Sequence, residues 1–314
     1  MTASVGPHRS IAQASPREKF LAELLDALWQ RYRERVEYVA TYERVIRDAG
    51  GTFVNDHIAF RTFALQHPAA GIFSLSRIFE ALGYRAAGNY HFEDKQLSAI
   101  HYQHPGGEFP KLFISELRTW ELPIEAQEII HRIGHSHRPQ IESDILTRLA
   151  RLADGGGDFA LLGRVIDCFH QLPWAVPSKA DVLELNKYSQ YAAWVAVHGY
   201  NVNHFTSLVN SHGVARLNQL EGTIAALQEA GVPMKSEIEG EPGSKLRQTA
   251  TEAVKIPVAV RDENEKATTM PWSYAYFELA ERNEIVDPET GKRGRFEGFL
   301  GPQATNLFEM TRVK

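Results

Sequence analysis

The sequence of 314 residues contains a single cysteine, Cys168, and this scarcity excludes several kinds of site. One cysteine cannot form an internal disulfide or supply a cysteine-rich zinc or iron–sulfur cluster. Long apolar runs are also missing. The sequence contains no run of about 18 apolar residues, which is the length needed to span a bilayer. Residues 1–16 lack the continuous apolar core of a signal peptide. We therefore expect a cytoplasmic protein with no membrane partner.

The charge pattern points to no polymeric partner either. Lys and Arg number 34 against 39 Asp and Glu, and neither sign is gathered in a long block that would favour nucleic acid. No glycine-rich phosphate loop or dinucleotide fingerprint follows a predicted strand. The hydrophobic content of 43% is sufficient for a sizeable core. These features predict a globular protein that acts on, or binds, a small molecule.

The most informative feature present is an internal repeat that carries one histidine in each copy. His57 and His204 each lie in an apolar, strand-like run that precedes an amphipathic helix. The glycine that closes this helix follows after 26 residues in the first copy, at Gly83, and after 27 in the second, at Gly231. Equivalent histidines in duplicated modules are expected to face each other across a pseudo-twofold axis.

The repeat and its interruptions divide the chain into parts. We expect an α+β fold in which two β-α-β-β-β modules form a curved, eight-stranded mixed sheet, a half-barrel with helices outside. The expected parts are a mobile tail (1–16), N-terminal helices (17–50), the first module (51–120), a helical insertion (121–198), and the second module with a C-terminal segment (199–314).

A third strand-like run, residues 274–280, places the carboxylate of Glu278 in apolar surroundings, where an unpaired charge would be costly. Two histidines and one carboxylate form the ligand set of a mononuclear non-haem iron site. A single histidine on a strand is more often a hydrogen-bonded core residue. The repeat shifts this balance and favours metal ligation by His57 and His204.

Other residues compete for a role in the site. Glu116, in the last strand of the first module, is the pseudo-symmetric counterpart of Glu278, so either carboxylate could complete the ligand set. His198 is a weaker ligand candidate. The insertion contains a histidine cluster with partly helical spacing, interrupted by glycine and serine: His131, His135 and His137.

Two further polar residues are predicted to point into the same cavity. Arg61 shares a strand face with His57 and would lie on the order of 7 Å from it. It could bind a substrate carboxylate, or it could form a structural ion pair; the pattern leaves both open. Gln248 alternates inward on a later strand and could donate or accept a hydrogen bond at a substrate oxygen.

Several motifs together resemble those of the 2-oxoadipate dioxygenase/decarboxylase family, within the vicinal-oxygen-chelate superfamily. They are residues 56–61, 203–206, 276–282, 296–299 and 306–309, and the resemblance extends from about residue 18 to 312. The C-terminal part is also similar to the end of 4-hydroxyphenylpyruvate dioxygenase. There the glutamate of the aromatic-Glu motif binds iron, and this similarity favours Glu278 over Glu116.

The resemblance implies that iron(II) is bound by His57, His204 and Glu278, and that Arg61 holds a substrate carboxylate. Zinc, nickel or manganese could occupy such a site in a crystal. The implied reaction converts a 2-oxo dicarboxylic acid, best matched by 2-oxoadipate, with O2 to CO2 and 2-hydroxyglutarate, as in lysine catabolism. Two alternatives are a metal-dependent, glyoxalase-like lyase or isomerase on the same scaffold, and a non-enzymatic ligand-binding protein.

Overall fold

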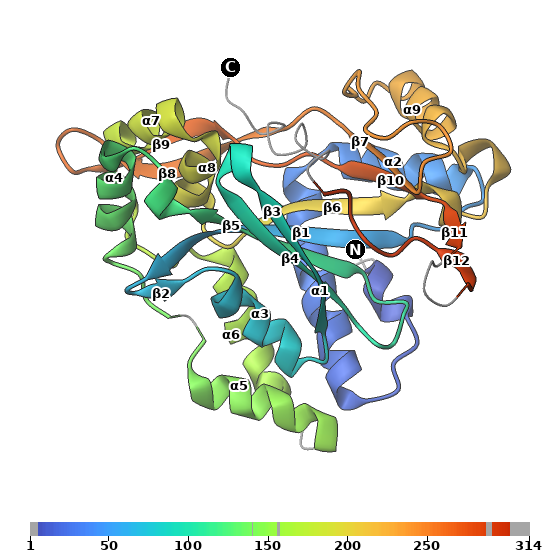
Figure 1. Cartoon of the computed structure of the whole chain (residues 1–314), viewed down its shortest axis with the longest axis horizontal. Helices are drawn as coiled ribbons and strands as arrows, with labels where there is room; N and C mark the ends of the chain where they lie inside the picture. The colour runs from blue at the N-terminus through green and yellow to red at the C-terminus, as the bar shows by residue number, and fades with distance from the viewer. Residues whose placement is uncertain (1–5, 140, 156–157, 287–290, 302–314) are drawn as a thin grey trace.

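The computed structural model describes residues 6–139, 141–155, 158–286 and 291–301, and its centre is one curved sheet with helices around it (Figure 1). The α-helices are α1 (Pro16–Arg35), α2 (Tyr38–Asp48), α3 (Ile72–Ala81), α4 (Ile124–Gly134), α5 (Ser143–Ala150), α6 (Leu162–His170), α7 (Lys179–Tyr188), α8 (Gln190–His198) and α9 (Leu220–Glu229). The short 3-10 helices are η1 (Pro7–Ser10), η2 (Glu93–Lys95), η3 (Thr119–Glu121), η4 (Arg151–Asp154), η5 (Phe159–Leu161), η6 (Val209–Ser211) and η7 (Ala215–Leu217). The strands are β1 (Asn55–Gln66), β2 (Ala69–Ala70), β3 (Arg85–Phe92), β4 (Leu97–Gln103), β5 (Lys111–Arg118), β6 (Val202–Leu208), β7 (Leu246–Ala250), β8 (Lys255–Arg261), β9 (Ala267–Ser273), β10 (Glu278–Arg282), β11 (Glu284–Val286) and β12 (Arg293–Arg295).

The strand order of the main sheet reflects the repeat. The order is β3-β4-β5-β1-β6-β10-β7, and β2 pairs with the end of β1. The first strands of the two modules, β1 and β6, pair antiparallel at the centre, whereas β5 runs parallel to β1 and β10 runs parallel to β6. The expected curved, mixed half-barrel is therefore confirmed. Its eight strands include β2, because β8 and β9 form a separate hairpin outside this sheet.

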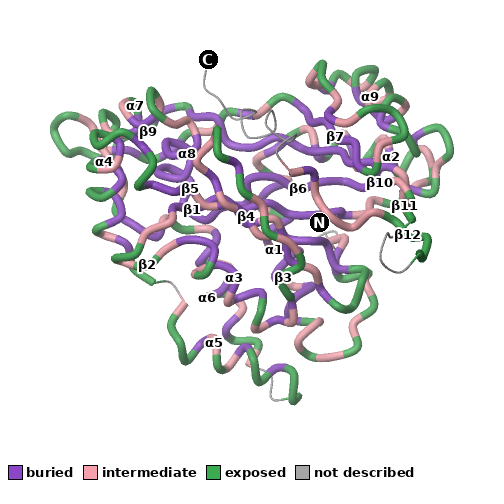
Figure 2. Tube along the Cα trace, in the orientation of Figure 1, coloured by how far each residue is buried: buried purple, intermediate pink, exposed green. Residues whose placement is uncertain are grey.

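The central strands β1, β6 and β10 are buried along almost their whole length, although each carries polar or charged residues among its apolar ones (Figure 2). On one face, Trp29 of α1 packs edge-on against Phe205 of β6, with ring centroids 4.9 Å apart. Side chains alternate along a strand, so His204 and Thr206, the neighbours of Phe205, point to the opposite face. The N-terminal helices thus close one side of the sheet and leave the histidine side for a pocket.

The helices of the two modules end where the sequence predicts. Gly83 and Gly231, which follow α3 and α9, adopt positive φ angles of 106° and 83°, a backbone conformation that strongly favours glycine after a helix. In the insertion range, α4 to α8 form the predicted helical region.

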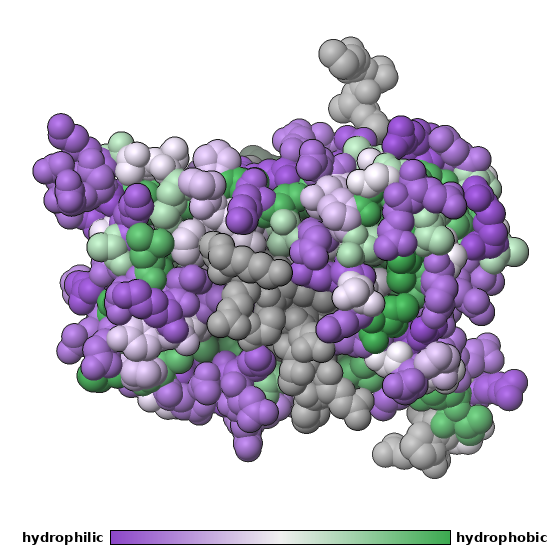
Figure 3. Space-filling view, turned by 90° about the horizontal axis from the view of Figure 1, so that it is seen from above, coloured by the Kyte–Doolittle hydropathy of each residue, from purple (hydrophilic) through white to green (hydrophobic). Residues whose placement is uncertain are grey.

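None of the helices in the described parts of the chain is long and apolar enough to span a membrane. Hydrophilic residues predominate on the face shown in Figure 3, where apolar residues form only separate patches.

Two strand predictions need correction. The strand expected over residues 274–280 is wrong in its first half, because β10 begins only at Glu278. Residues 274–277 cross from the β8–β9 hairpin to the main sheet, and their backbone bonds to Thr251 and Val254 instead of a neighbouring strand. Strand β3 was not predicted, because its largely exposed residues at the sheet edge carry no apolar alternation.

The prediction of a mobile tail over residues 1–16 is wrong for its described part. His8, in η1, is 1% exposed, and its ring nitrogens lie 2.8 Å from Asp26 Oδ1 and 2.9 Å from Asn55 Oδ1. The amide of Asn55 in turn donates to the carbonyls of His57 and Thr206, where the β1–β6 pairing shifts register. The N-terminal segment is thus anchored beside the central strands. Residues 1–5 lie outside the described residues, and the division into parts remains a prediction.

We predict that His8→Ala lowers the free energy of unfolding by about 1–3 kcal/mol, because the buried Oδ1 of Asn55 loses the imidazole and Oδ1 of Asp26 keeps the backbone N–H of residue 8 but loses the ring nitrogen. Urea denaturation followed by circular dichroism measures this change. The control is Ser10→Ala in the same short helix, whose exposed hydroxyl donates to the carbonyl of Pro7. Equal stability of the two variants would mean that the His8 contacts contribute nothing.

Candidate metal centre

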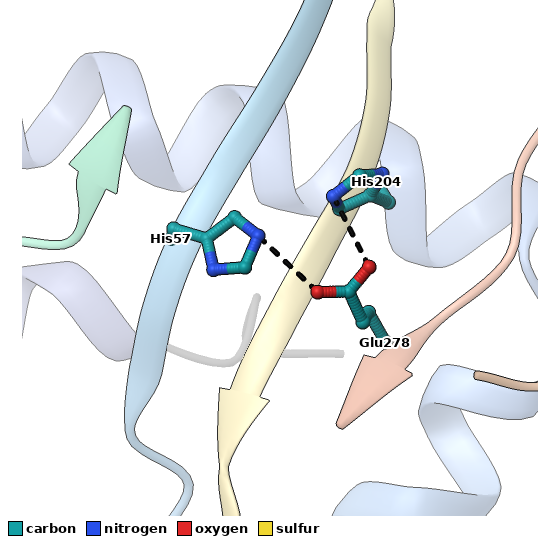
Figure 4. Close-up of side chains that lie close together, drawn as sticks. All are labelled: His57, His204 and Glu278. Carbon is teal, nitrogen blue, oxygen red and sulfur yellow. Dashed lines mark ion pairs between the residues drawn. The ribbon is translucent and has the colours of Figure 1, made fainter. Parts of the chain in front are cut away.

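Strand register brings two histidines and one glutamate together. His57 on β1 pairs with Thr206 on β6, and Thr206 pairs with Glu278 on β10, so these three residues form one row across adjacent strands. Paired residues share a face of the sheet, and His204, two residues before Thr206, points to the same face. His57 Nε2 lies 3.3 Å from Glu278 Oε1, and His204 Nε2 lies 3.5 Å from Glu278 Oε2 (Figure 4).

The residue before each histidine fixes the orientation of its ring. Asp56 Oδ2 lies 2.8 Å from Nδ1 of His57, and Asn203 Oδ1 lies 3.0 Å from Nδ1 of His204. Each Nδ1–H therefore has an acceptor, and each Nε2 is directed toward Glu278. This is the arrangement in which histidines commonly bind metals, with the second ring nitrogen held by an oxygen. The repeat thus duplicates the orienting group as well as the histidine.

The donor atoms suit a divalent cation. One ligand atom from each of His57, His204 and Glu278 can be chosen so that all three lie within 4.8 Å of one another. Glu278 is 0% exposed, and its Oε2 has no hydrogen-bond partner among the described residues. Its Oε1 accepts a hydrogen bond from the hydroxyl of Thr206. A buried carboxylate with an unsatisfied oxygen is costly in isolation, and a metal ion would satisfy it.

The electrostatics of the two histidines differ. Burial opposes protonation of His57, but its hydrogen bonds to Asp56 and Glu278 outweigh burial and raise its pKa. Burial lowers the pKa of His204 far below the usual value, and the positive charges of His57 and Arg61 lower it further. The pKa of Asp56 lies well below its usual value despite burial, because Arg282 and His57 stabilise the carboxylate. A neutral His204 is already in the form that binds a metal.

The three residues open into a pocket, with about 500 Å³ of empty space when the adjoining open solvent is included, that also contains Arg61 and Gln248. The lining residues are His57, Ala59, Phe60, Arg61, Phe92, Phe113, Ser115, Asn203, His204, Gln248, Tyr276, Glu278, Phe299 and Leu300. Most of this wall is apolar or aromatic, with a few polar groups placed among it, which is typical of small-molecule sites.

Arg61 is 2% exposed and is held by aromatic side chains. Its guanidinium lies over the rings of Tyr191, at 5.0 Å, and Trp194, at 5.4 Å. It also hydrogen bonds to Tyr276, whose ring stacks on His204 with centroids 4.9 Å apart. Gln248 donates to Glu239 Oε2 at 3.2 Å, and its Oε1 lacks a partner among the described residues. Both predicted substrate-binding residues therefore lie at the pocket in fixed orientations.

The competing candidates lie elsewhere. Glu116 accepts a hydrogen bond from the Ile72 amide at the start of α3, so it caps a helix on the opposite side of β5. His198 bonds to the carbonyl of Ser273, and burial lowers its pKa to about 3. The histidine cluster of the insertion does not assemble: His131 and His135 are exposed, and His137 is buried against the Tyr200 hydroxyl.

Sequence reasoning did not assign a role to several residues that complete the site. Thr206 bonds to His57 and Glu278, Asp56 and Asn203 orient the histidines, and Phe299 and Leu300 close the pocket. A signal for the orienting pair existed, because a short side chain with an acceptor oxygen precedes each repeated histidine. Phe299 and Leu300 follow the last described strand, and no periodic pattern connects them to a distant pocket. Residues 306–309, the last of the motifs that resemble the family, lie outside the described residues.

Comparison with known proteins agrees with this geometry. Residues 22–306 match the 2-oxoadipate dioxygenase/decarboxylase family. The chain belongs to this family. It is therefore an oxidoreductase of the dioxygenase/decarboxylase type, and the resemblance seen in the sequence is confirmed.

Individual relatives support the family and the fold. A protein of Arabidopsis thaliana named 2-oxoadipate dioxygenase/decarboxylase, chloroplastic, is 28% identical over 275 residues, which cover 82% of this chain and 67% of the relative. The hydroxyglutarate synthase of Oryza sativa, solved in complex with 2-oxoadipate, has a TM-score of 0.74 at 24% identity, with 96% and 95% of the two chains covered. A glyoxalase superfamily protein from Ralstonia eutropha JMP134 has a TM-score of 0.79 at 23% identity, with 96% and 92% covered. The last two show a shared glyoxalase-type fold.

We predict that His57→Ala, His204→Ala and Glu278→Gln each remove most divalent-metal binding, because each variant loses one of three protein ligands. Metal content after anaerobic iron(II) loading and desalting is the measurement. Glu116→Gln is the matched control, since it changes the pseudo-symmetric carboxylate outside the site. A variant that keeps stoichiometric metal would exclude its residue from the ligand set.

Proposed function

We propose that the protein is a non-haem iron(II)-dependent dioxygenase/decarboxylase that acts on a 2-oxo dicarboxylic acid, with 2-oxoadipate as the best match. The observation that carries this proposal is the cluster of His57, His204 and Glu278 at one wall of a pocket that also contains Arg61. The family name and the 2-oxoadipate bound to the Oryza sativa protein support the substrate class. We further propose that it works in lysine breakdown and in the cytoplasm.

The charges of the pocket favour a dicarboxylate. Among its lining residues, Arg61 and Glu278 carry opposite charges, and a divalent ion would leave an excess of positive charge. A substrate with two carboxylates balances this excess better than one with a single carboxylate. The apolar wall, which includes Phe92, Phe113 and Leu300, would exclude water around the chain between them.

The proposed reaction balances as 2-oxoadipate and O2 giving CO2 and 2-hydroxyglutarate. The bond between the first carboxylate and the keto carbon breaks, the keto carbon becomes a carboxylate, and the adjacent carbon gains a hydroxyl group. Bound iron(II) would supply Lewis acidity and pass electrons to dioxygen, and the net electrons would come from the substrate, through its decarboxylation and its hydroxylated C–H bond. His57, His204 and Glu278 would hold the ion as its protein ligands and would leave coordination positions for substrate. Asp56 and Asn203 hold the imidazoles in place, and Arg61 orients the substrate.

The direct test is an anaerobic panel of 2-oxo acids with the iron(II)-loaded protein, followed by addition of isotopically heavy dioxygen. We expect no turnover before oxygen is added. After addition, 2-oxoadipate should give CO2 and 2-hydroxyglutarate, and the 2-hydroxyglutarate should carry two heavy oxygen atoms from the dioxygen. Mass spectrometry of the products measures both. Turnover under strict anaerobiosis would instead support a lyase or isomerase. Failure to bind stoichiometric metal would support a non-enzymatic binding protein.

We predict that Arg61 recognises the distal carboxylate of the substrate and so confers the preference for dicarboxylates. A charge-assisted bidentate contact in a desolvated pocket contributes about 1.5–3 kcal/mol, so Arg61→Ala should lower kcat/KM for 2-oxoadipate roughly ten- to a hundred-fold. Metal content should not change. Arg61→Lys should recover only part of the activity, because lysine keeps the charge but loses the planar fork.

The comparison that decides this role uses a 2-oxo monocarboxylate of equal chain length. Arg61→Ala should affect this compound much less than 2-oxoadipate, because it has no distal carboxylate. If both substrates lose the same factor, Arg61 serves the metal-binding end of the substrate or the fold.

A further inference from the structure

Arg282 is buried at the far end of the strand that carries Glu278. It is the last residue of β10, four positions after Glu278, so the two side chains leave the strand on the same face. Its side chain has no exposed surface. A buried guanidinium must satisfy several donors at once, and its partners therefore show what it holds together.

One side of the guanidinium binds the carboxylate that orients a candidate metal ligand. Nε and Nη2 of Arg282 donate to Oδ1 and Oδ2 of Asp56 at 2.6 and 2.9 Å, a bidentate pair that is wholly buried. Oδ2 of the same carboxylate accepts from Nδ1 of His57. Arg282 thus fixes the rotation of Asp56, and Asp56 fixes the ring of His57.

The other side of the guanidinium holds the wall of the pocket. Nη1 donates to the carbonyls of Phe296 and Gly298, and the guanidinium carbon lies 5.0 Å from the centre of the Phe299 ring. The Phe299 ring packs edge-on against His57, with centroids 4.8 Å apart, and it lines the pocket. The Phe299 amide also donates to the Tyr90 hydroxyl at 3.1 Å. The Arg282 side chain therefore contacts both residues 296–299 of the pocket wall and Asp56, which orients His57.

We infer that Arg282 is a positioning residue that couples metal binding at His57 to the closed arrangement of residues 296–300. An ion at the site requires His57 in one orientation, and that orientation is linked through Asp56 and Arg282 to the segment carrying Phe299. Coupling of this kind is reciprocal, so metal binding must order the segment, and the ordered segment must strengthen metal binding. The inference rests on the proposed metal site but adds a residue and a coupling to it.

The first test uses the unmodified protein. Hydrogen exchange is measured with and without iron(II) under anaerobic conditions, at the amides of Phe296, bonded to the Asn283 carbonyl, and Phe299, bonded to the Tyr90 hydroxyl. We expect iron(II) to slow exchange at both amides. Bound iron(II) with unchanged exchange would overturn the coupling and leave the metal site intact. Absence of iron(II) binding would refute the proposed function, and the coupling with it.

The second test uses Arg282→Lys, which keeps the charge but cannot span both oxygens of Asp56 and two backbone carbonyls. We expect iron(II) affinity, measured by competition with a chelator, to fall about ten- to a hundred-fold, as is typical when a group supporting a metal ligand is lost. The slowing of exchange at residues 296–300 should also disappear. A folded Arg282→Lys protein with affinity within about twofold of the original would overturn the inference.

Arg247→Lys is the matched control for a purely structural effect. Arg247 is also a buried arginine in the main sheet, on β7, and it pairs with Glu221 and Glu281, away from the pocket. This variant should lower stability without changing iron(II) affinity or the exchange response. Equal losses of affinity in both variants would assign the Arg282 effect to general stability. If Arg282→Lys does not fold, the exchange result on the unmodified protein decides.

Discussion

The structure depends on the burial of the Glu278 carboxylate at the centre of the sheet. No water-exposed surface remains on this residue, so its charge must be balanced by groups that the neighbouring strands supply. His57 and Thr206, which lie in one row with Glu278 across three strands, provide these groups, and His204 contributes from the same face. The antiparallel pairing of β1 and β6 is therefore a requirement of the site as well as of the fold, because a shift of one residue would turn the histidines away.

The duplication is symmetric in geometry and asymmetric in charge. Both histidines receive an oxygen at Nδ1 from the preceding residue, but Asp56 supplies a carboxylate and Asn203 a neutral amide. The buried carboxylate needs a cation, and Arg282 meets this need, whereas the amide needs none. Among the described residues, this asymmetry explains why the link through an arginine to residues 296–299 starts at the first histidine. A repeat can thus acquire a second role in one copy while the shared geometry persists.

The sequence allowed prediction of the features that repeat or alternate, and the exceptions have local physical causes. The helix ends at Gly83 and Gly231 and the two central histidines follow from spacing. The choice between Glu116 and Glu278 does not follow from spacing, because it depends on how the strands pair. Ser115 pairs with Arg61 and faces the pocket, so Glu116, the next residue, must face away. The contacts of His8 and Phe299 join distant segments, and no local pattern encodes them.

The Asp56–Arg282 pair has a further electrostatic consequence. A lone carboxylate behind His57 would add a negative charge beside the site and oppose the approach of an anionic substrate. Because Arg282 neutralises Asp56 within a buried, bidentate contact, the carboxylate can orient the imidazole without changing the net charge of the pocket. In the proposed iron(II) form, the charges that a substrate meets are then those of Glu278, Arg61 and the metal ion. Orientation of the ligand and attraction of the substrate are thereby separated, although both depend on charged groups around the same histidine.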